Sequence, residues 1–259
     1  MPDSNIISSQ KERVLADGFC YPETQCDRDL IEQLSRLGHQ HAHNIRKTLG
    51  DKEIGIGSAR GYHEIVQRSP GRWDIPMSPT QLKINEYDQH WMDLVRALLG
   101  PDAQFTFAGI VISEPNQPAQ NWHIDSPHES KEHRGPHAIN VLLALHDISR
   151  SMGPTEVAVG SHRLTNHLKY PALVREELIY QHETTTPERL AETSSQAVPA
   201  RHTQEMRSGS CLVFDDRLLH RGGANHSSSD RSYAYLGYCR NTYVGTTHFE
   251  AERSVNDPT

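Results

Sequence analysis

Residues 105–113 read FTFAGIVIS, and this β-rich run marks the point at which the character of the sequence changes. Before it, apolar residues recur at helical spacing. After it, short runs of β-branched and aromatic residues are separated by Gly, Pro, Asn and Ser, a pattern that predicts strands. Many short strands with few helices between them favour a mainly β, closed or double-sheet architecture such as a jelly roll. The expected strands span residues 105–113, 138–145, 156–159, 210–214 and 232–238.

Two helices are expected before this β-rich part. Asp27 can cap the first helix and Gly50 can end it. The second is expected over about residues 79–99, because Gly100-Pro101 stops the helical pattern there. The apolar face of the first helix consists of Leu30, Ile31, Leu34 and Leu37.

Near the N-terminus, residues 14–21 are the first possible strand. Residues 51–80 are rich in Gly, Pro and Ser and are expected to form loops, with a short strand near residues 54–56. We therefore expect one domain over residues 1–259, with a helical part at about 1–100 and a β core at about 104–241. The long polar stretch 163–207 is typical of a lid or a binding loop.

Composition narrows the partners that the chain is expected to have. The net charge of -7 gives no electrostatic reason to expect a nucleic acid. No segment approaches the roughly 20 apolar residues of a membrane span, and the first ten residues lack the pattern of a signal peptide. With four cysteines at no metal-type spacing, we expect a cytoplasmic protein that binds a small molecule. The sequence leaves open whether it is a monomer or a homodimer.

The most informative polar motif is His123-Ile124-Asp125. Residues i and i+2 of a strand point to the same face, so His123 and Asp125 can bind one metal while Ile124 turns away. His220 follows a strand-like run and precedes Gly222-Gly223, and it can supply a third ligand. Two imidazoles and one carboxylate are the ligands of non-haem Fe(II) oxygenases. The structural alternative is a buried, hydrogen-bonded histidine.

Arg231 opens the next expected strand. A guanidinium group stays charged inside a barrel and binds a carboxylate with two hydrogen bonds. One strand after His220, Arg231 could hold the distal carboxylate of a keto acid whose other end chelates the metal. The alternative is a surface arginine that pairs with Asp230 or Asp216.

Four segments carry a likeness to a known family: PAQNWHID at 118–125, MGPTEVAVGSH at 152–162, the run from Gly209 through His220 to Asn225, and Arg231 in a His-x10-Arg spacing. In order and spacing they resemble the phytanoyl-CoA dioxygenase-like branch of the Fe(II)/2-oxoglutarate-dependent oxygenases, over about residues 105–240. The N-terminal helices fit that family only loosely, and Val159 stands where many members have proline.

The resemblance implies a double-stranded β-helix, a jelly-roll barrel, with helices packed outside. It implies that His123, Asp125 and His220 bind Fe(II) and that Arg231 binds 2-oxoglutarate, with O₂ as the other cosubstrate. Gln120 and Thr155 match positions that contact the cosubstrate in close relatives; the alternatives are a turn residue and a β-branched strand start. Halogenating relatives have a small residue where this chain has Asp125, which favours hydroxylation.

Further polar residues are weaker candidates for substrate contacts: Arg72, Trp73, His128 and Asn140. For each, a structural role in loop packing, at the surface or in satisfying a backbone group is an equal alternative. His39 and His43 have i,i+4 spacing but no third ligand in view.

The sequence thus predicts a dioxygenase that oxidises, and most simply hydroxylates, a C–H bond of a small organic molecule, with release of succinate and CO₂. The small size of the chain favours a free small molecule of secondary metabolism or catabolism as the substrate. Two rival interpretations are a non-catalytic jelly-roll protein that binds a small acid, and a cupin-type metalloenzyme without a keto acid.

Overall fold

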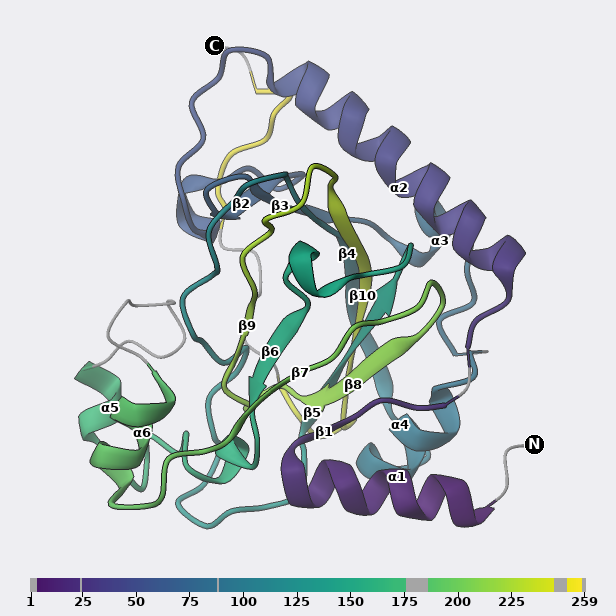
Figure 1. The fold of residues 1–259 in the computed structure, drawn as a ribbon. Helices are drawn as coiled ribbons and strands as arrows, with labels where there is room; N and C mark the ends of the chain where they lie inside the picture. The colour runs from purple at the N-terminus through teal and green to yellow at the C-terminus, as the bar shows by residue number, and fades with distance from the viewer. Residues whose placement is uncertain (1–3, 24, 88, 176–185, 245–250, 258–259) are drawn as a thin grey trace.

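Two antiparallel sheets form the centre of the computed structural model, which describes residues 4–23, 25–87, 89–175, 186–244 and 251–257 (Figure 1). The larger sheet has the strand order β1-β8-β5-β10-β4-β3-β2, and the smaller has the order β7-β6-β9. This arrangement confirms the predicted mainly β jelly-roll architecture. The strands of the larger sheet are β1 (Phe19–Cys20), β2 (Val66–Ser69), β3 (Arg72–Pro76), β4 (Gln104–Ser113), β5 (Ala138–Ala144), β8 (Cys211–Asp215) and β10 (Arg231–Cys239); those of the smaller are β6 (Thr155–Ala158), β7 (Arg201–Thr203) and β9 (His220–Gly222).

Alternation along the strands gives the larger sheet two different faces. The outer face presents aliphatic side chains such as Ile110 and Leu236, which pack in one core cluster with residues of the N-terminal helices. The inner face presents Tyr233 with Phe214 and Leu212, which form a second cluster with Val157 of the smaller sheet. The same inner face also carries polar residues, among them Arg72, Asn140 and Arg231.

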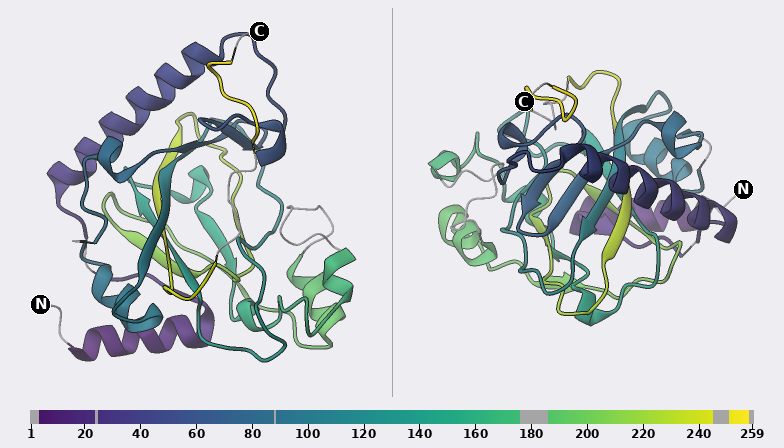
Figure 2. Two further views of the ribbon diagram at one scale, coloured as in Figure 1. Left: turned by 180° about the vertical axis from the view of Figure 1, so that it is seen from behind. Right: turned by 90° about the horizontal axis from the view of Figure 1, so that it is seen from above.

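Helices cover both outer faces of the two-sheet core (Figure 2). α1 (Ser4–Asp17), α2 (Arg28–Leu49) and α4 (Met92–Leu99) contribute buried residues to the cluster outside the larger sheet. α5 (Ala172–Arg175) and α6 (Pro187–Ser194) lie beyond the smaller sheet, where Leu173 and Leu190 pack against Trp122. No helix in the described part of the chain combines the length and apolar character that a bilayer span needs.

The first predicted helix is confirmed as α2. The Asp27 carboxylate accepts a hydrogen bond from the Asp29 amide at 2.7 Å, and the helix ends at Gly50 in the left-handed region with φ of 53°. Gly38, in the middle of α2, is buried against Ile110 of β4, and a Cβ on Gly38 would overlap the Ile110 side chain. This glycine thus sets how closely α2 approaches the sheet.

Three predictions about the N-terminal part were wrong. The expected helix over residues 79–99 is two helices, α3 (Pro79–Leu82) and α4, because Lys83 adopts a left-handed conformation with φ of 54°. Residues 14–17 belong to α1, so only Phe19–Cys20 of the first candidate strand is a strand. Residues 66–76 are not a loop: β2 and β3 pair across Pro70-Gly71, where Gly71 has a φ of 62°.

The long stretch 163–207 contains α5, α6 and β7. Its residues 176–185, which include Thr184 and Thr185, lie outside the described part of the chain. Its role as a lid therefore stays a prediction.

The contact between Gly38 and Ile110 predicts an unusual stability effect. Gly→Ala in a helix interior ordinarily stabilises by about 1 kcal/mol, but overpacking a core costs about 1–3 kcal/mol. We expect Gly38→Ala to lower the melting temperature. Ile110→Val, which removes the overlapping methyl group, should cost about 0.5–1.5 kcal/mol alone. In the double variant the losses should be less than additive. A higher melting temperature for Gly38→Ala, or strictly additive losses, would contradict this packing.

Candidate active site

The three predicted metal ligands converge at one point between the sheets. His123 and His220 form an antiparallel bridge in which the His123 amide donates to the His220 carbonyl at 3.0 Å and the reverse bond is 2.9 Å. The Asp125 carboxylate lies 3.9 Å from His123 Nε2 and 3.6 Å from His220 Nε2. One donor atom from each residue lies within 4.8 Å of the others, and no other such group of three or more occurs among the described residues. This spacing fits a single small cation.

Each imidazole is oriented by a backbone carbonyl. His123 Nδ1 lies 2.9 Å from the Asn121 carbonyl, and His220 Nδ1 lies 2.9 Å from the Leu218 carbonyl. With Nδ1–H donating to oxygen, Nε2 of each ring carries the lone pair that a metal requires. Burial and the neighbouring His220 lower the pKa of His123 to about 3. The ring is therefore neutral and ready to bind a metal at physiological pH.

Asn140 holds the carboxylate ligand. Its Nδ2 donates to Asp125 Oδ2 at 2.6 Å, and the Asn140 side chain is buried on β5. Strand parity explains this geometry, because Asn140 points to the inner face while Ile139 and Val141 pack outside. The same oxygen, Oδ2, lies nearest His220 Nε2, and Oδ1 lies nearest His123 Nε2. The sequence offered Asn140 as a substrate contact, and the structure shows it bound to a proposed metal ligand.

A second group of residues converges on Gly222-Gly223, directly after His220. Gln120 Oε1 accepts hydrogen bonds from Arg72 Nη1 at 2.7 Å and from the Gly222 amide at 3.1 Å. Thr155, at the start of β6, pairs with Gly222 in the smaller sheet. A side chain on Gly222 would overlap the Arg72 guanidinium. Glycine here lets Arg72 reach from the larger sheet to the smaller one.

Arg72 and Arg231 form a buried pair of cations. Both lie opposite Ser113, on the two strands that flank β4, and they are 3% and 2% exposed. Arg231 Nη1 donates to the Met152 and Gly223 carbonyls, each at 3.1 Å, and Arg72 Nη2 donates to the Gly223 carbonyl at 3.2 Å. In both, Nε is buried without a hydrogen-bond partner. The alternative pairing of Arg231 with Asp216 does not occur, because that carboxylate contacts Ser126 and His137.

The positive charges of Arg72 and Arg231 are destabilised by burial. Burial and the Arg231 charge lower the pKa of Arg72 well below its usual value, and burial lowers the pKa of Arg231. No carboxylate among the described residues is ion-paired with either guanidinium. Buried charges are costly unless they are paired, so an anion bound beside these two guanidinium groups would be stabilised.

Sequence reasoning missed a third arginine on this side of the core. Arg68 of β2 makes two contacts of 2.7 Å with Asp74 Oδ2, through Nε and Nη2, and Tyr235 donates to Asp74 Oδ1 at 2.6 Å. The Gly, Pro and Ser content of residues 51–80 predicts loops, so no sequence pattern places these residues near the site. The Ser-Pro-Gly turn at 69–71 between two apolar-containing runs was the available signal.

Comparison with known proteins places the chain in a family. A family model described as phytanoyl-CoA dioxygenase (PhyH) matches residues 15–233. The chain belongs to the phytanoyl-CoA dioxygenase family. It is an oxidoreductase with a dioxygenase or oxygenase role.

Individual relatives are distant. Dioxygenase hkm4 of Aspergillus hancockii is 26% identical over 245 residues, which are 88% of this chain and 67% of that protein. A crystal structure of EctD from S. alaskensis with 2-oxoglutarate and 5-hydroxyectoine aligns with a TM-score of 0.64 at 19% identity, over 98% of this chain and 83% of that one. AviO1 from Streptomyces viridochromogenes Tue57 aligns with a TM-score of 0.61 at 19% identity, over 93% of this chain and 97% of that one. These likenesses support the fold of this phytanoyl-CoA dioxygenase family member.

Two sequence candidates lie elsewhere in this family member. Trp73 has the opposite strand parity to Arg72: its indole donates to Glu114 at 2.8 Å and stacks under Arg46 of α2, so it faces the helix and not the inner space. His128 is buried, with Nε2 at 3.2 Å from Thr165 Oγ1. This contact fits a structural role for His128.

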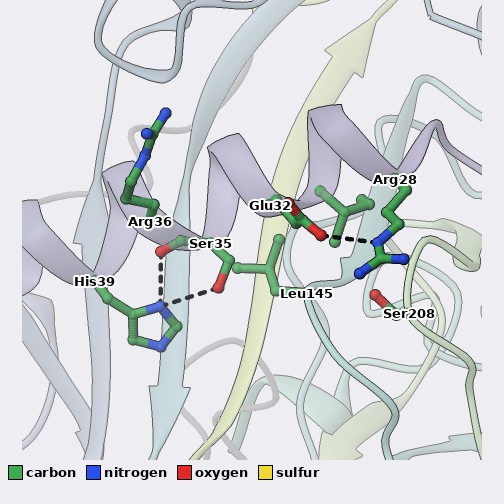
Figure 3. A pocket seen from close by; sticks show the side chains of 8 residues that line it. Arg28, Glu32, Ser35, Arg36, His39, Leu145 and Ser208 are labelled. Atoms are coloured by element: carbon green, nitrogen blue, oxygen red, sulfur yellow. Dashed lines mark hydrogen bonds and ion pairs between the residues drawn. The ribbon is translucent and has the colours of Figure 1, made fainter.

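The histidines of α2 do not form a metal site with a third ligand. His39 Nδ1 lies 2.7 Å from the Ser35 carbonyl, and its Nε2 lies 3.0 Å from Ser232 Oγ. His39 lines an open cavity of about 460 Å³ beside α2, outside the larger sheet (Figure 3). The cavity is also lined by Arg28, Ile31, Glu32, Ser35, Arg36, Leu145 and Ser208, none of which belongs to the metal or arginine groups.

The contact from Asn140 to Asp125 predicts a loss of metal affinity on truncation. Removal of a side chain that orients a metal ligand typically costs about 10–100-fold in affinity. We expect Asn140→Ala to raise the Kd for Mn²⁺ by this factor, measured by chelator competition. The exposed Asn44→Ala on α2 is the matched control and should bind like the wild type. Equal Mn²⁺ affinity in both variants would show that the amide does not support the carboxylate.

Proposed function

We propose that this protein is a non-haem Fe(II)- and 2-oxoglutarate-dependent dioxygenase that hydroxylates a C–H bond of a small organic molecule and releases succinate and CO₂. One observation carries the proposal: a His-Asp-His group lies between the sheets, and Gln120 links Gly222, two residues after His220, to one of two buried guanidinium groups that form no ion pair with an acid among the described residues. A metal chelator with a distal carboxylate, such as a keto diacid, fits such a pair of sites.

The donor set supports iron. Two neutral imidazoles and one carboxylate on one side of a cation leave the remaining positions open, as non-haem Fe(II) oxygenases require. The ligands come from a strand bridge and are fixed by second contacts to Asn121, Leu218 and Asn140. We therefore propose His123, Asp125 and His220 as the iron ligands.

The arginine pair supports 2-oxoglutarate. Its C5 carboxylate could accept hydrogen bonds from the Nε groups of Arg72 and Arg231 that are otherwise without partners. We propose that Gln120 positions the Arg72 guanidinium and that Thr155 lines the same cavity. The sequence suggested Arg72 as a substrate contact; we propose instead that it binds the cosubstrate. The EctD structure, which contains 2-oxoglutarate, is consistent with a keto acid in this fold.

When bound, the iron and the keto acid supply the oxidising chemistry. The residues of the chain position the metal ligands and the cosubstrate. The bridge between His123 and His220 fixes two ligands, Asn140 orients the third, and the arginine pair fixes the far end of the cosubstrate. Burial of both imidazoles and both guanidinium groups excludes water from the cosubstrate and strengthens these charge interactions.

The rival interpretations make different predictions for the same residues. A non-catalytic protein would bind 2-oxoglutarate without consuming it. A cupin-type metalloenzyme would use the metal group without needing the arginine pair, which would then remain unpaired at a large cost. Turnover of the keto acid in the presence of Fe(II) distinguishes all three.

Loss of a metal ligand should abolish turnover. We expect His123→Ala and Asp125→Ala to form no succinate from 2-oxoglutarate in the presence of Fe(II), O₂ and a substrate, measured by mass spectrometry. His226 is an exposed histidine that precedes β10 in the sequence, and the control variant His226→Ala should behave like the wild type. Succinate formation at the wild-type rate in either ligand variant would reject the proposed iron site.

Loss of either arginine should weaken cosubstrate binding more than catalysis. Hydrogen bonds to charged groups contribute about 1.5–3 kcal/mol each, so Arg72→Ala and Arg231→Ala should each raise the Kd for 2-oxoglutarate about 10–100-fold. Titration of the Mn²⁺-loaded protein measures this without turnover. Because both groups would bind one carboxylate, the double variant should lose less than the product of the two effects. An unchanged Kd in Arg72→Ala, with Arg36→Ala as control, would return Arg72 to a purely structural role.

A further inference from the structure

One short turn contacts two of the three proposed metal ligands. The turn, residues 215–218, joins β8 to β9 and is closed by the Leu218 amide, which donates to the Asp215 carbonyl at 2.9 Å. The Leu218 carbonyl lies 2.9 Å from His220 Nδ1, and the Asp216 carbonyl accepts a hydrogen bond from the Asp125 amide at 2.8 Å. The position of Asp125 relative to His220 therefore depends on where this turn places two carbonyl groups.

A buried hydrogen-bonded network fixes the middle of the turn. The Ser126 hydroxyl donates to Asp216 Oδ2, and the Ser126 amide donates to the Asp216 carbonyl at 3.3 Å. Ser126 Oγ also lies 2.8 Å from His137 Nε2. Because the only Ser126 hydroxyl proton is directed to the carboxylate, the His137 Nε2–H is the donor of this second bond. The three residues are at most 2% exposed, so water competes little for these hydrogen bonds.

The network continues to the segment that follows β10. His137 Nδ1 lies 3.5 Å from Glu129 Oε2, and the same oxygen accepts a hydrogen bond from Arg240 Nη2 at 2.7 Å. The Arg240 amide donates to the His137 carbonyl at 2.9 Å. The Tyr243 ring stacks on the His137 ring, with centroids 4.2 Å apart and an angle of 23° between the planes. His137 is thus held by its backbone, by Nδ1 and by one face of its ring, which keeps Nε2 directed at Ser126.

Ser126, His137 and Glu129 have the residue types of a nucleophile, a base and an acid. A hydrolytic site does not fit their geometry, because a nucleophile must reach its substrate and Ser126 is 1% exposed. The Ser126 proton is also directed to Asp216 and not to the imidazole. These contacts fit a role inside the protein.

We propose that Ser126, His137 and Asp216 are positioning residues for the proposed iron site. By fixing the turn, they hold Asp125 and His220 at the separation that one metal ion requires. The inference rests on the proposed function, because it takes these two residues as iron ligands. A shift of the turn would move a carboxylate and an imidazole relative to each other, and the arrangement of ligands around the metal would change.

The network and Asn140 act on different parts of the same ligand. Asn140 contacts the Asp125 carboxylate, whereas the network acts through the hydrogen bond from the Asp125 amide to the turn. Loss of Asn140 frees one carboxylate, but loss of the network displaces a turn that also orients His220. The arrangement of ligands around the metal is therefore the property that the network controls.

Co²⁺ is a suitable probe, because its visible absorption spectrum reports the arrangement of its ligands. Ser126→Ala removes the hydroxyl group, and His137→Phe removes the donor but keeps a ring beside Tyr243. We expect each variant to raise the Kd for Co²⁺ about 10–100-fold and to alter the spectrum of the bound ion. His137→Gln, whose amide can donate to Ser126, should recover most of both. The double variant should lose less than the product of the two effects, because both changes break one chain of hydrogen bonds.

Ser194→Ala is the matched control. Ser194 is also buried, and its hydroxyl donates to the Leu190 carbonyl at 2.8 Å within α6. This variant should lower the melting temperature and leave the Kd and the spectrum of Co²⁺ unchanged. If Ser126→Ala does not fold, Asp216→Asn replaces it. The amide of that variant still accepts from Ser126, but without a charge, so the Kd should rise by a smaller factor.

The possible outcomes separate this inference from the proposed function. A wild-type Kd and spectrum in folded Ser126→Ala and His137→Phe overturn the positioning role. Equal effects of Ser194→Ala also overturn it, because a loss of stability would then explain the loss of metal affinity. Absence of Co²⁺ binding by the wild type would instead reject the iron site itself, and the positioning role with it.

Discussion

The paired backbone hydrogen bonds between His123 and His220 are the constraint on which the rest of the site depends. They join two segments that are far apart in the sequence, and they set both imidazole rings at the same level between the sheets. Once this bridge exists, strand parity places Asp125 beside the two rings and Gly222 opposite Thr155. The positions of the three possible metal ligands and of the Gly222 contacts therefore depend on one register.

The second constraint is the cost of buried positive charge. Arg72 and Arg231 are held by carbonyl groups and by Gln120, with no acid to neutralise them in the described part of the chain. Such an arrangement costs the empty protein stability, and a carboxylate bound beside the two guanidinium groups would recover part of that cost.

Charge separates the two ends of the inner face. Toward Gly223, neither Arg72 nor Arg231 is ion-paired with an acid among the residues that the structure describes, whereas toward Asn140 Arg68 is paired with Asp74. An unpaired guanidinium binds an anion strongly, and a paired one binds it more weakly and with defined direction.

Local patterns were enough to predict the β architecture, the first long helix and the three residues that the structure brings together as a possible metal site, because apolar periodicity, capping residues and the His-x-Asp motif are all readable in short stretches of sequence. The contacts of each polar residue followed only from the folded chain. Arg72 and Trp73 are adjacent in sequence but face opposite sides of β3, Asn140 binds Asp125, and Arg68 joins the site through a hairpin that looked like a loop. Contacts between distant segments depend on strand register and sheet curvature, and no local pattern of residues encodes either of these.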